Sequence, residues 1–511
     1  MKQYYLGIEF GSTRVKAVLI DGEHRIVKSG DYTWKSSLEN GVWTYHMEDV
    51  QTGLRTAIRN LGELPGAVSA MGISGMMHGY LAFDKDWNLL APFRTWQNTM
   101  TGEAAEQLTA EFGFNIPQRW SIAHLYQAIL NGEAHVKNIA HITTLAGYVH
   151  YLLTGENVLG VGEASGMFPI DSEALDYDAA MLEKFDALIA KYGFAWTARS
   201  VLPKVLTAGQ AAGALTQAGS TFLDGLLLSA GIPFCPPEGD AGTGMTATNA
   251  VAPRTGNVSA GTSIFAMVVL EKPLSKVYQE IDMVTTPSGK PVAMVHCNNC
   301  TNDMNAWVSL LGETAKLFGA EVSTGELFTK LYQKSLEGDA DCSGVLTYNY
   351  MAGEGITHLD EGRPMVVRKP ESSFTLANFL RSQLYATMST LKLGMDILAE
   401  EHVAIDSLTG HGGLFKTPVV GQKYMAAACR APVTCMESAG EGGPYGMALL
   451  ASYLVQKQDG QTLEQYLETE IFADVKRTTL APDPEDEAGF DRYLSWYRSA
   501  LAAENAAVKA F

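Results

Sequence analysis

Two short glycine turns in this sequence have residue types that suit the binding of phosphate. The first turn joins two apolar runs in LGIEFGSTRV and consists of Gly11, Ser12, Thr13 and Arg14. The second lies in GNVSAGTSIFAMVVL, near the middle of the chain, and consists of Gly261, Thr262 and Ser263. Backbone N–H groups in tight glycine turns, assisted by hydroxyl groups, form a concave donor surface for phosphate oxygens. We therefore expect the two turns to hold one polyphosphate.

Glu9 stands in the run that leads into the first turn. A carboxylate beside a phosphate is repulsive unless a hard cation such as Mg²⁺ lies between them. Glu9 is therefore a predicted Mg²⁺ ligand. The alternative is an ordinary surface hairpin in which Glu9 is solvated.

Asp240 lies in a glycine-rich stretch, PPEGDAGTGMTATNAV, where the backbone can approach a substrate closely. A carboxylate placed in such a loop can accept the proton of a substrate hydroxyl group. The alternative is that Asp240 caps a helix that begins near Gly242.

Apolar periodicity predicts the elements that position these residues. Strands are expected over residues 4–10, 15–21, 26–32 and 68–75, with a helix over 47–61. This alternation is typical of an α/β fold. The pattern restarts after the glycine-rich stretch, which predicts two domains, 1–246 and 247–511. The likeness of the two hairpins indicates an internal duplication, with coincidence as the alternative.

The chain of 511 residues has a net charge of −19 and no lysine-rich block, which argues against nucleic acid and anionic membranes as main partners. Its longest apolar runs are shorter than the roughly 20 residues of a membrane span. We expect a cytoplasmic protein that binds small molecules, with a homodimer as one possible assembly. Near the C-terminus, PDPEDEAGFD is expected to be a solvated loop before a final helix.

Six cysteines are too few for a disulfide framework in a chain of this length. Cys297 and Cys300 form the one close pair. Zinc or redox chemistry is an alternative for this pair, but a structural zinc site requires four ligands. Two partly buried thiols are the favoured interpretation.

Common nucleotide-binding motifs are absent, since GHGGLFKT has Phe415 where a P-loop requires glycine. Taken together, the ordered segments resemble the FGGY family of carbohydrate kinases over nearly the full length. The segments that carry the resemblance are LGIEFGSTRVKAVLID, GISGMMHGYLAFD, LLAPFRTWQNT, YLLTGENVLGVGEASG, EGDAGTG, SAGTS, YNYMAGEG, and GHGGLFKTP with EGGPYGMALLASYL.

The resemblance implies a two-domain, actin-like ATPase fold of the sugar kinase and heat-shock protein type, with a cleft between the lobes. It implies ATP and Mg²⁺ as cofactors. It also implies Asp240 as the general base, in contact with both substrate and Mg²⁺, since a kinase that acts on an alcohol needs a base for the hydroxyl proton and one positioned carboxylate suffices. By the same resemblance, Gly412 and Gly413 belong to the adenosine end of the nucleotide site. The residues implied for the sugar site are Met77, His78, Trp96, Gln97, Asn98 and Asp240. Trp stacks on the apolar face of a sugar, while His and amides bind hydroxyl groups.

The sequence departs from the family pattern in ways that bear on the substrate. Glu9 replaces the usual Asp, and Ala241 stands where xylulose kinases commonly have Asn. In TWQNT the usual Asp and Arg of the sugar loop are replaced by neutral residues, which favours a neutral polyhydroxy substrate. We expect a ketopentose such as xylulose, then another polyol, with a sugar acid last.

Two other functions remain open from the sequence. One is an actin-like or chaperone-like ATPase switch that phosphorylates no metabolite. The other is a catalytically weakened sugar-binding homologue, which Glu9 and Ala241 suggest.

Overall fold

The computed structural model describes residues 3–223, 228–436 and 442–510. The chain divides into two compact units. Unit 1 comprises Met1–Pro253, Val269–Ala293 and Glu441–Asp474, and unit 2 comprises Arg254–Val268, Met294–Gly440 and Val475–Phe511. Unit 1 thus includes two segments from the second half of the chain, and the sequence boundary at 246/247 stays a prediction.

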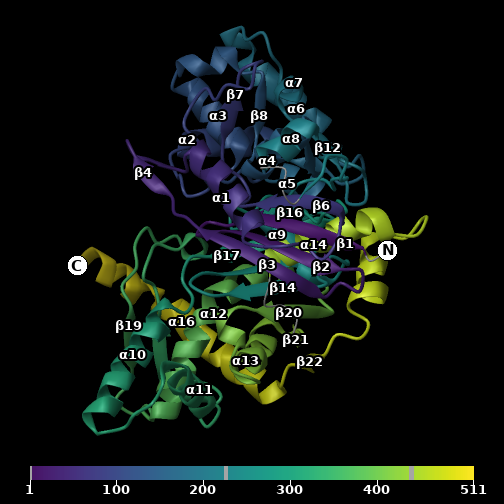
Figure 1. Ribbon diagram of the computed structural model, residues 1–511. Helices are drawn as coiled ribbons and strands as arrows, with labels where there is room; N and C mark the ends of the chain where they lie inside the picture. The colour runs from purple at the N-terminus through teal and green to yellow at the C-terminus, as the bar shows by residue number, and fades with distance from the viewer. Residues whose placement is uncertain (1–2, 224–227, 437–441, 511) are drawn as a thin grey trace. The chain divides into compact units, whose positions relative to one another are not determined.

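A five-stranded mixed sheet forms the centre of unit 1 (Figure 1). Its order is β13-β6-β1-β2-β3, with β1 antiparallel to β2 and parallel to β6. The strands are β13 (Glu238–Gly239), β6 (Val68–Gly75), β1 (Tyr4–Phe10), β2 (Arg14–Asp21) and β3 (Ile26–Thr33). The predicted strands over 4–10, 15–21, 26–32 and 68–75 are confirmed.

Helices from distant parts of the chain cover this sheet. The predicted helix near residue 47 is α1 (Met47–Arg59), and α4 (Leu145–Thr154) packs on β6. Helix α14 (Gly442–Gln456) packs on β1, β6 and α9 (Asp240–Ala247). A Cβ atom at Gly7 would lie 2.0 Å from the carbonyl oxygen of Pro444, so glycine permits this close packing.

The other elements of unit 1 are shorter or surround the sheet. They are β4 (Ser37–Glu39), β5 (Val42–Thr44), β7 (Leu81–Phe83), α2 (Gly102–Phe112), α3 (Ser121–Leu130), β8 (His141–Thr143), β9 (Val158–Gly160), α5 (Val161–Ala164), β10 (Ile170–Asp171), β11 (Asp176–Tyr177), α6 (Ala179–Ile189), α7 (Ala198–Val201), β12 (Lys204–Leu206), α8 (Gln217–Phe222), β16 (Ile281–Thr285) and α15 (Leu463–Tyr466).

Unit 2 repeats the strand arrangement of unit 1. Five consecutive strands of a seven-stranded sheet have the order β21-β20-β14-β15-β17, read from β21 (Val433–Met436) through β20 (Ser407–His411), β14 (Thr255–Ala260) and β15 (Ile264–Val269) to β17 (Pro291–Cys297). The sheet continues with β22 (Arg477–Leu480) beyond β21 and with β16 beyond β17. As β1 does in unit 1, β14 pairs antiparallel with the next strand in sequence and parallel with a distant one. This shared topology supports the internal duplication that the two hairpins indicate.

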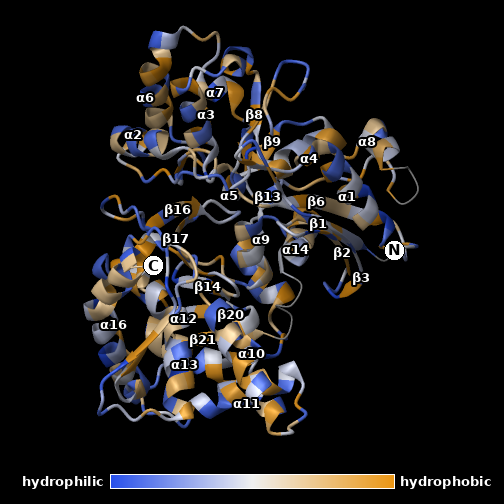
Figure 2. Cartoon of the chain, turned by 90° about the vertical axis from the view of Figure 1, so that its left-hand side faces the viewer, coloured by the Kyte–Doolittle hydropathy of each residue, from blue (hydrophilic) through white to orange (hydrophobic). Residues whose placement is uncertain are grey.

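Helices and a second small sheet complete unit 2. They are α10 (Asn302–Leu317), α11 (Thr324–Ser335), β18 (Val345–Tyr348), β19 (Met365–Arg368), α12 (Leu376–Glu400), α13 (Val420–Cys429), β22 (Arg477–Leu480) and α16 (Pro484–Ala510). Blue and orange residues alternate along α11 in Figure 2, as expected for a helix with one buried face. Among the described residues, no helix has the length and apolar character needed to span a membrane.

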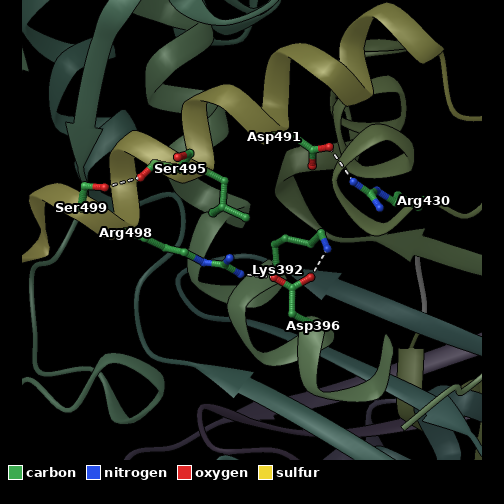
Figure 3. Close-up of a pocket in the computed structure, with 8 residues that line it drawn as sticks. Lys392, Asp396, Arg430, Asp491, Ser495, Arg498 and Ser499 are labelled. Carbon is green, nitrogen blue, oxygen red and sulfur yellow. Dashed lines mark hydrogen bonds and ion pairs between the residues drawn. The ribbon is translucent and has the colours of Figure 1, made fainter. Parts of the chain in front are cut away.

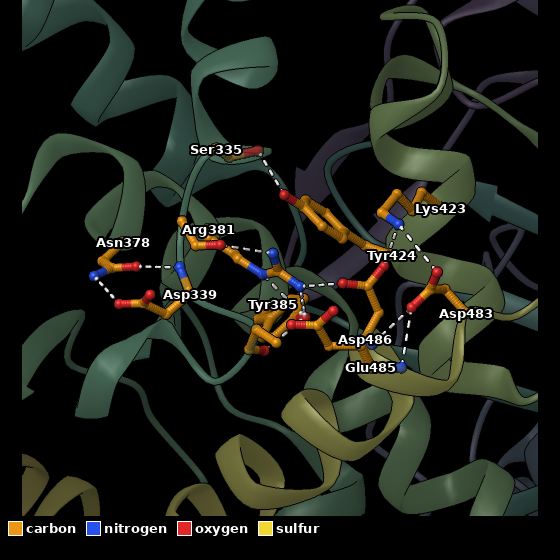
Figure 4. Close-up of polar contacts among 12 residues, drawn as sticks. Ser335, Asp339, Asn378, Arg381, Tyr385, Lys423, Tyr424, Asp483, Glu485 and Asp486 are labelled. Atoms are coloured by element: carbon orange, nitrogen blue, oxygen red, sulfur yellow. Dashed lines mark hydrogen bonds and ion pairs between the residues drawn. The ribbon is translucent and has the colours of Figure 1, made fainter.

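The acidic run near the C-terminus is helical, so the prediction of a solvated loop there is wrong for its later part. Helix α16 begins at Pro484, a favoured first helical residue, and its first turn is acidic, which the helix dipole stabilises. Asp486 is buried and pairs with Arg381 and with Lys423, both at 2.5 Å (Figure 4). These ion pairs anchor the start of α16 to α12 and α13.

Candidate active site

The first glycine turn has its carbonyl groups bound from behind. Trp34 donates from Nε1 to the carbonyl of Gly11 at 2.7 Å, and the Tyr45 hydroxyl donates to the carbonyl of Ser12 at 2.6 Å. In a trans peptide the C=O and the following N–H point in opposite directions. The N–H groups of Ser12 and Thr13 therefore point away from the two aromatic rings. This is the orientation that phosphate binding requires.

The sheet of unit 1 brings the two predicted metal ligands to one edge. Glu9 on β1 and Glu238 on β13 both align with Ser74 on β6, and Asp240 follows directly after β13. All three strands are parallel, so Glu9 and Asp240 lie at their carboxyl ends. This edge is where open α/β sheets bind ligands.

Asp240 is held by backbone N–H groups. Its Oδ1 accepts from the N–H of Met77 at 3.2 Å and from the N–H of Ala241 at 3.0 Å. The residue is open to solvent, yet partial desolvation by the surrounding protein raises the pKa of its carboxyl, which the two N–H groups oppose. Helix α9 begins at Asp240 itself and its N-cap is Gly239. Asp240 is thus not the capping residue that the alternative interpretation requires.

Glu9 has the electrostatic surroundings of a cation ligand. Burial, and then the charge of Asp240, raises the pKa of its carboxyl to about 8, while Lys16 lowers it. A Cβ atom at Gly443 would lie 1.8 Å from Oε1 of Glu9, so the carboxylate rests against the start of α14. Mg²⁺ in kinases is commonly held by one or two carboxylates together with substrate phosphates. The Glu9 and Asp240 pair fits that donor set.

Met77 and His78 are both buried directly beside the Asp240 loop. His78 has a φ of +70°, a strained conformation for a residue other than glycine. Its Nδ1 donates to the carbonyl of Gly166 at 3.0 Å, and its ring stacks on Trp120 with centroids 6.1 Å apart. A Cβ atom at Gly166 would lie 2.7 Å from Nδ1. The structure therefore fixes the orientation of this imidazole.

The three residues of the predicted sugar loop have different surroundings. Trp96 is 38% exposed and donates from Nε1 to the hydroxyl of Ser12 at 3.2 Å, which links this loop to the first turn. Gln97 has a buried Oε1 without a hydrogen-bond partner among the residues that the structure describes. Asn98 accepts from the N–H of Trp43 and donates to its carbonyl, both at 2.8 Å. Asn98 thus holds the loop in place, and its contact with a sugar stays a prediction.

Arg94, the cation nearest in sequence to this loop, is already paired. It is buried, forms an ion pair with Glu133 and lies over the ring of Tyr80 at 5.4 Å. The guanidinium charge is therefore neutralised within unit 1.

The second glycine turn in unit 2 shows the same arrangement as the first. Thr301 donates to the carbonyl of Gly261 from its N–H at 3.1 Å and from its hydroxyl at 2.7 Å. The N–H of Cys300 donates to the carbonyl of Thr262 at 3.1 Å. By the same peptide geometry, the N–H groups of Thr262 and Ser263 point away from this bracing loop.

Gly412 and Gly413 directly follow β20 in unit 2. Gly412 has a φ of +99°, and a Cβ atom there would lie 2.4 Å from the carbonyl oxygen of Ala260. Because Ala260 precedes Gly261, the predicted adenosine residues lie beside the second turn. The family resemblance also includes the segment that forms helix α14, and this helix packs within unit 1.

Cys297 and Cys300 are buried thiols, and burial raises the pKa of both. Within residues 3–223, 228–436 and 442–510, no cluster of three or more His, Cys, Asp or Glu side chains is arranged to hold a metal ion. The part of Cys300 that acts on the second turn is its backbone N–H.

A polar groove of about 460 Å³ in unit 2 is lined by side chains of α12 and α16 together with Arg430 (Figure 3). Lys392 and Arg498 both pair with Asp396, and Arg430 pairs with Asp491 at 2.5 Å. The charges that line the groove are therefore accounted for by ion pairs with one another.

The sequence alone does not predict the side chains that donate hydrogen bonds to the carbonyl groups of the two turns, which are Trp34, Tyr45 and Thr301. The bonds from Trp34 and Tyr45 join residues 23 and 33 positions apart. No local spacing signals such contacts, whereas the glycine and hydroxyl residues of a turn are adjacent and recognisable.

Comparisons with known proteins agree with this geometry. Residues 4–245 match the N-terminal domain of the FGGY family of carbohydrate kinases, and residues 256–455 match its C-terminal domain. The xylulose kinase of Haemophilus influenzae is 23% identical over 517 residues, covering 96% of this chain and 99% of that protein.

Solved structures confirm the predicted fold. The ligand-bound xylulose kinase of Lactobacillus acidophilus aligns with a TM-score of 0.81 at 16% identity, over 98% of this chain and 99% of its own. The gluconate kinase of the same organism gives 0.81 at 17% identity, over 99% of both chains. The fold is thus the two-domain, actin-like fold of sugar kinases. With both family domains matched in order, the chain belongs to the FGGY family of carbohydrate kinases.

Proposed function

We propose that this carbohydrate kinase transfers the γ-phosphoryl group of MgATP to the terminal hydroxyl of a neutral ketose, with D- or L-xylulose as first choice. Asp240 serves as general base, and Glu9 and Asp240 are the Mg²⁺ ligands. The N–H groups of the first and second turns bind the phosphates, with Gly412 and Gly413 at the adenosine end.

The polar groups in and beside the predicted sugar loop support the choice of a neutral substrate. Gln97 offers an unpartnered amide oxygen, which suits a sugar hydroxyl. Arg94 is neutralised by Glu133 and so is unavailable to a substrate carboxylate. An unpaired buried carboxylate is costly, which disfavours a sugar acid such as gluconate.

The reaction requires little covalent chemistry from the protein. The sugar hydroxyl oxygen forms a bond to the γ-phosphorus, the bond to the β,γ-bridging oxygen breaks, and the hydroxyl proton passes to Asp240. Bound Mg²⁺ supplies charge neutralisation for the phosphates. Met77 holds Asp240 through its N–H, and the exposed ring of Trp96 offers a stacking surface for the sugar.

The test compares kcat/KM for D-xylulose, L-xylulose, L-ribulose, erythritol, glycerol and gluconate, with ADP release measured against a blank without sugar. We expect a xylulose enantiomer to rank first and gluconate last. Asp240→Asn is the control for background ATP hydrolysis.

Three outcomes would contradict the proposal in different ways. A tenfold or greater preference for gluconate would overturn the neutral-substrate argument. ADP release that is independent of sugar would favour an ATPase switch. Sugar binding without turnover would favour a sugar-binding homologue that has lost activity.

A further inference from the structure

Two loops of unit 2 are joined by hydrogen bonds, and one of them also binds the carbonyl groups of the second glycine turn. They are residues 298–301, which follow β17, and residues 349–354, which follow β18. Asn299 accepts at Oδ1 from the N–H groups of Met351 at 2.9 Å and Ala352 at 3.0 Å. Its Nδ2 donates to the carbonyl of Ala352 at 3.1 Å. The buried Asn299 amide therefore uses both of its polar atoms to join the two loops.

The buried carboxylate of Glu354, in the second loop, adds further hydrogen bonds to the first loop. Its side chain is 1% exposed, and Oε2 accepts from the N–H of Asn298 at 3.0 Å, the N–H of Asn299 at 3.3 Å and Nδ2 of Asn299 at 3.2 Å. Burial raises the pKa of this carboxyl to about 7, while the amide donors lower it, because amide hydrogen bonds are stronger to an ionised acceptor than to a neutral one. Glu354 therefore fixes the path of the 298–301 loop at its start.

The end of the same loop binds the turn. Thr301 and Cys300 hold the carbonyl groups of Gly261 and Thr262, and this directs the N–H groups of Thr262 and Ser263 to the opposite side. A displacement of the loop would thus rotate the peptide groups that face the phosphate. Glu354 itself has no need to touch the nucleotide.

We propose that Glu354 is a positioning residue for ATP, acting through the 298–301 loop on the phosphate-binding N–H groups of the second turn. The inference rests on the proposed function, in which this turn binds the nucleotide. It extends that function to a buried side chain that acts through the 298–301 loop and the second turn, without touching the ligand.

The test measures MgADP affinity by calorimetry on the full chain, together with KM for ATP and for sugar. Glu354→Ala removes the acceptor from three buried donors, and we expect MgADP to bind about tenfold more weakly or worse, with a matching rise in KM for ATP. KM for sugar is expected to stay unchanged. Glu354→Gln keeps one acceptor oxygen and should recover part of the affinity.

The matched control is Glu361→Gln, which changes an exposed carboxylate near the same loop. If Glu354→Ala does not fold, Thr301→Val removes one bond to Gly261 and should weaken MgADP binding by a smaller factor. Unchanged MgADP affinity in every folded variant, or an equal rise in KM for both substrates, would overturn the inference. A wild-type chain that binds MgADP yet phosphorylates no sugar would contradict the proposed function alone, because the affinity comparison still applies.

Discussion

One oxygen of Asp240 carries the bonds that fix this side chain. Both backbone N–H groups, from Met77 and Ala241, donate to Oδ1, so under the proposed function Oδ2 is the oxygen that we expect to receive the substrate proton. Desolvation raises the pKa of this carboxyl while the two N–H groups lower it. A base with a pKa nearer the working pH accepts a proton more readily, so the two opposing effects set its strength.

Asp240→Asn should abolish phosphoryl transfer while leaving nucleotide binding and the fold in place. The amide keeps an oxygen for the Met77 N–H but cannot accept the proton, so we expect kcat to fall on the order of 10²-fold or more. Initial rates with saturating sugar and ATP give kcat, and MgADP calorimetry gives binding. A variant with near-wild-type kcat would remove Asp240 from its catalytic role.

Glu9→Gln should weaken activation by Mg²⁺ more than it weakens sugar binding. The substitution keeps the size of the side chain and removes the negative charge that would attract Mg²⁺. A Mg²⁺ titration at saturating sugar is expected to show a midpoint at least severalfold higher than wild type. An unchanged midpoint would show that Glu9 is a half-buried side chain of β1 with no part in binding Mg²⁺.

At the scale of elements, each of the two glycine turns is held by hydrogen bonds from another segment of the same unit. Trp34 and Tyr45 stack with ring centroids 4.3 Å apart and bind consecutive carbonyl groups of the first turn. In unit 2 the corresponding bonds come from Thr301 and the backbone of Cys300. The two halves of the chain therefore reach the same turn geometry with different residues.

Tyr45→Phe tests this dependence on one hydroxyl group. The substitution keeps the stacked ring and removes the donor to the Ser12 carbonyl, so the turn loses one restraint worth about 1 kcal/mol. We expect KM for ATP to rise severalfold with kcat for bound substrates little changed. Tyr32→Phe on β3 is the control, and equal kinetics in the two variants would show that the Tyr45 hydroxyl does not position the turn.

The sequence predicts what is local and misses what is distant. The glycine turns, the strand over 4–10 and the order of the family segments are visible because each is encoded within a few adjacent residues. The burial of Asp486 is not visible, because its partner Arg381 lies 105 positions away. Likewise, nothing in the spacing of the second half indicates that α14 packs against β1 in unit 1.

At the scale of the whole chain, the repeated sheet topology accounts for the order of the functional segments. In each unit the first hairpin carries a glycine turn, and a distant strand that is parallel to the first strand of the hairpin leads into a second loop. In unit 1 that loop carries Met77 and His78, and in unit 2 it carries Gly412 and Gly413. Under the proposed function, this repeated arrangement holds the predicted sugar-site residues in unit 1 and the predicted adenosine-site residues in unit 2.

The stability of the folded chain is expected to depend on pH, and the buried carboxyl group of Glu238 is the clearest source of this dependence. Its side chain is 1% exposed and lies against Gly160 and Gly162, where a Cβ atom would come within 2.1 Å and 2.5 Å of its carboxyl oxygens. Burial raises the pKa of this carboxyl from 4.5 to about 8. Between those two values the folded chain binds more protons than the unfolded chain. The stability that the neutral carboxyl contributes is therefore complete below about pH 4.5 and is lost as the pH rises toward 8.

Glu238→Gln should flatten this dependence, because the amide is neutral at every pH and keeps an oxygen for the N–H of Glu163, which now donates to Glu238 at 2.9 Å. We expect the Tm of wild type to fall relative to the Tm of the variant between about pH 4.5 and 8. Thermal unfolding across that range measures the difference, with Glu371→Gln as the control for an exposed carboxylate. Parallel curves for Glu238→Gln and wild type would mean that Glu238 titrates alike in the folded and unfolded chain. In that case, water or a cation reaches its carboxylate in solution.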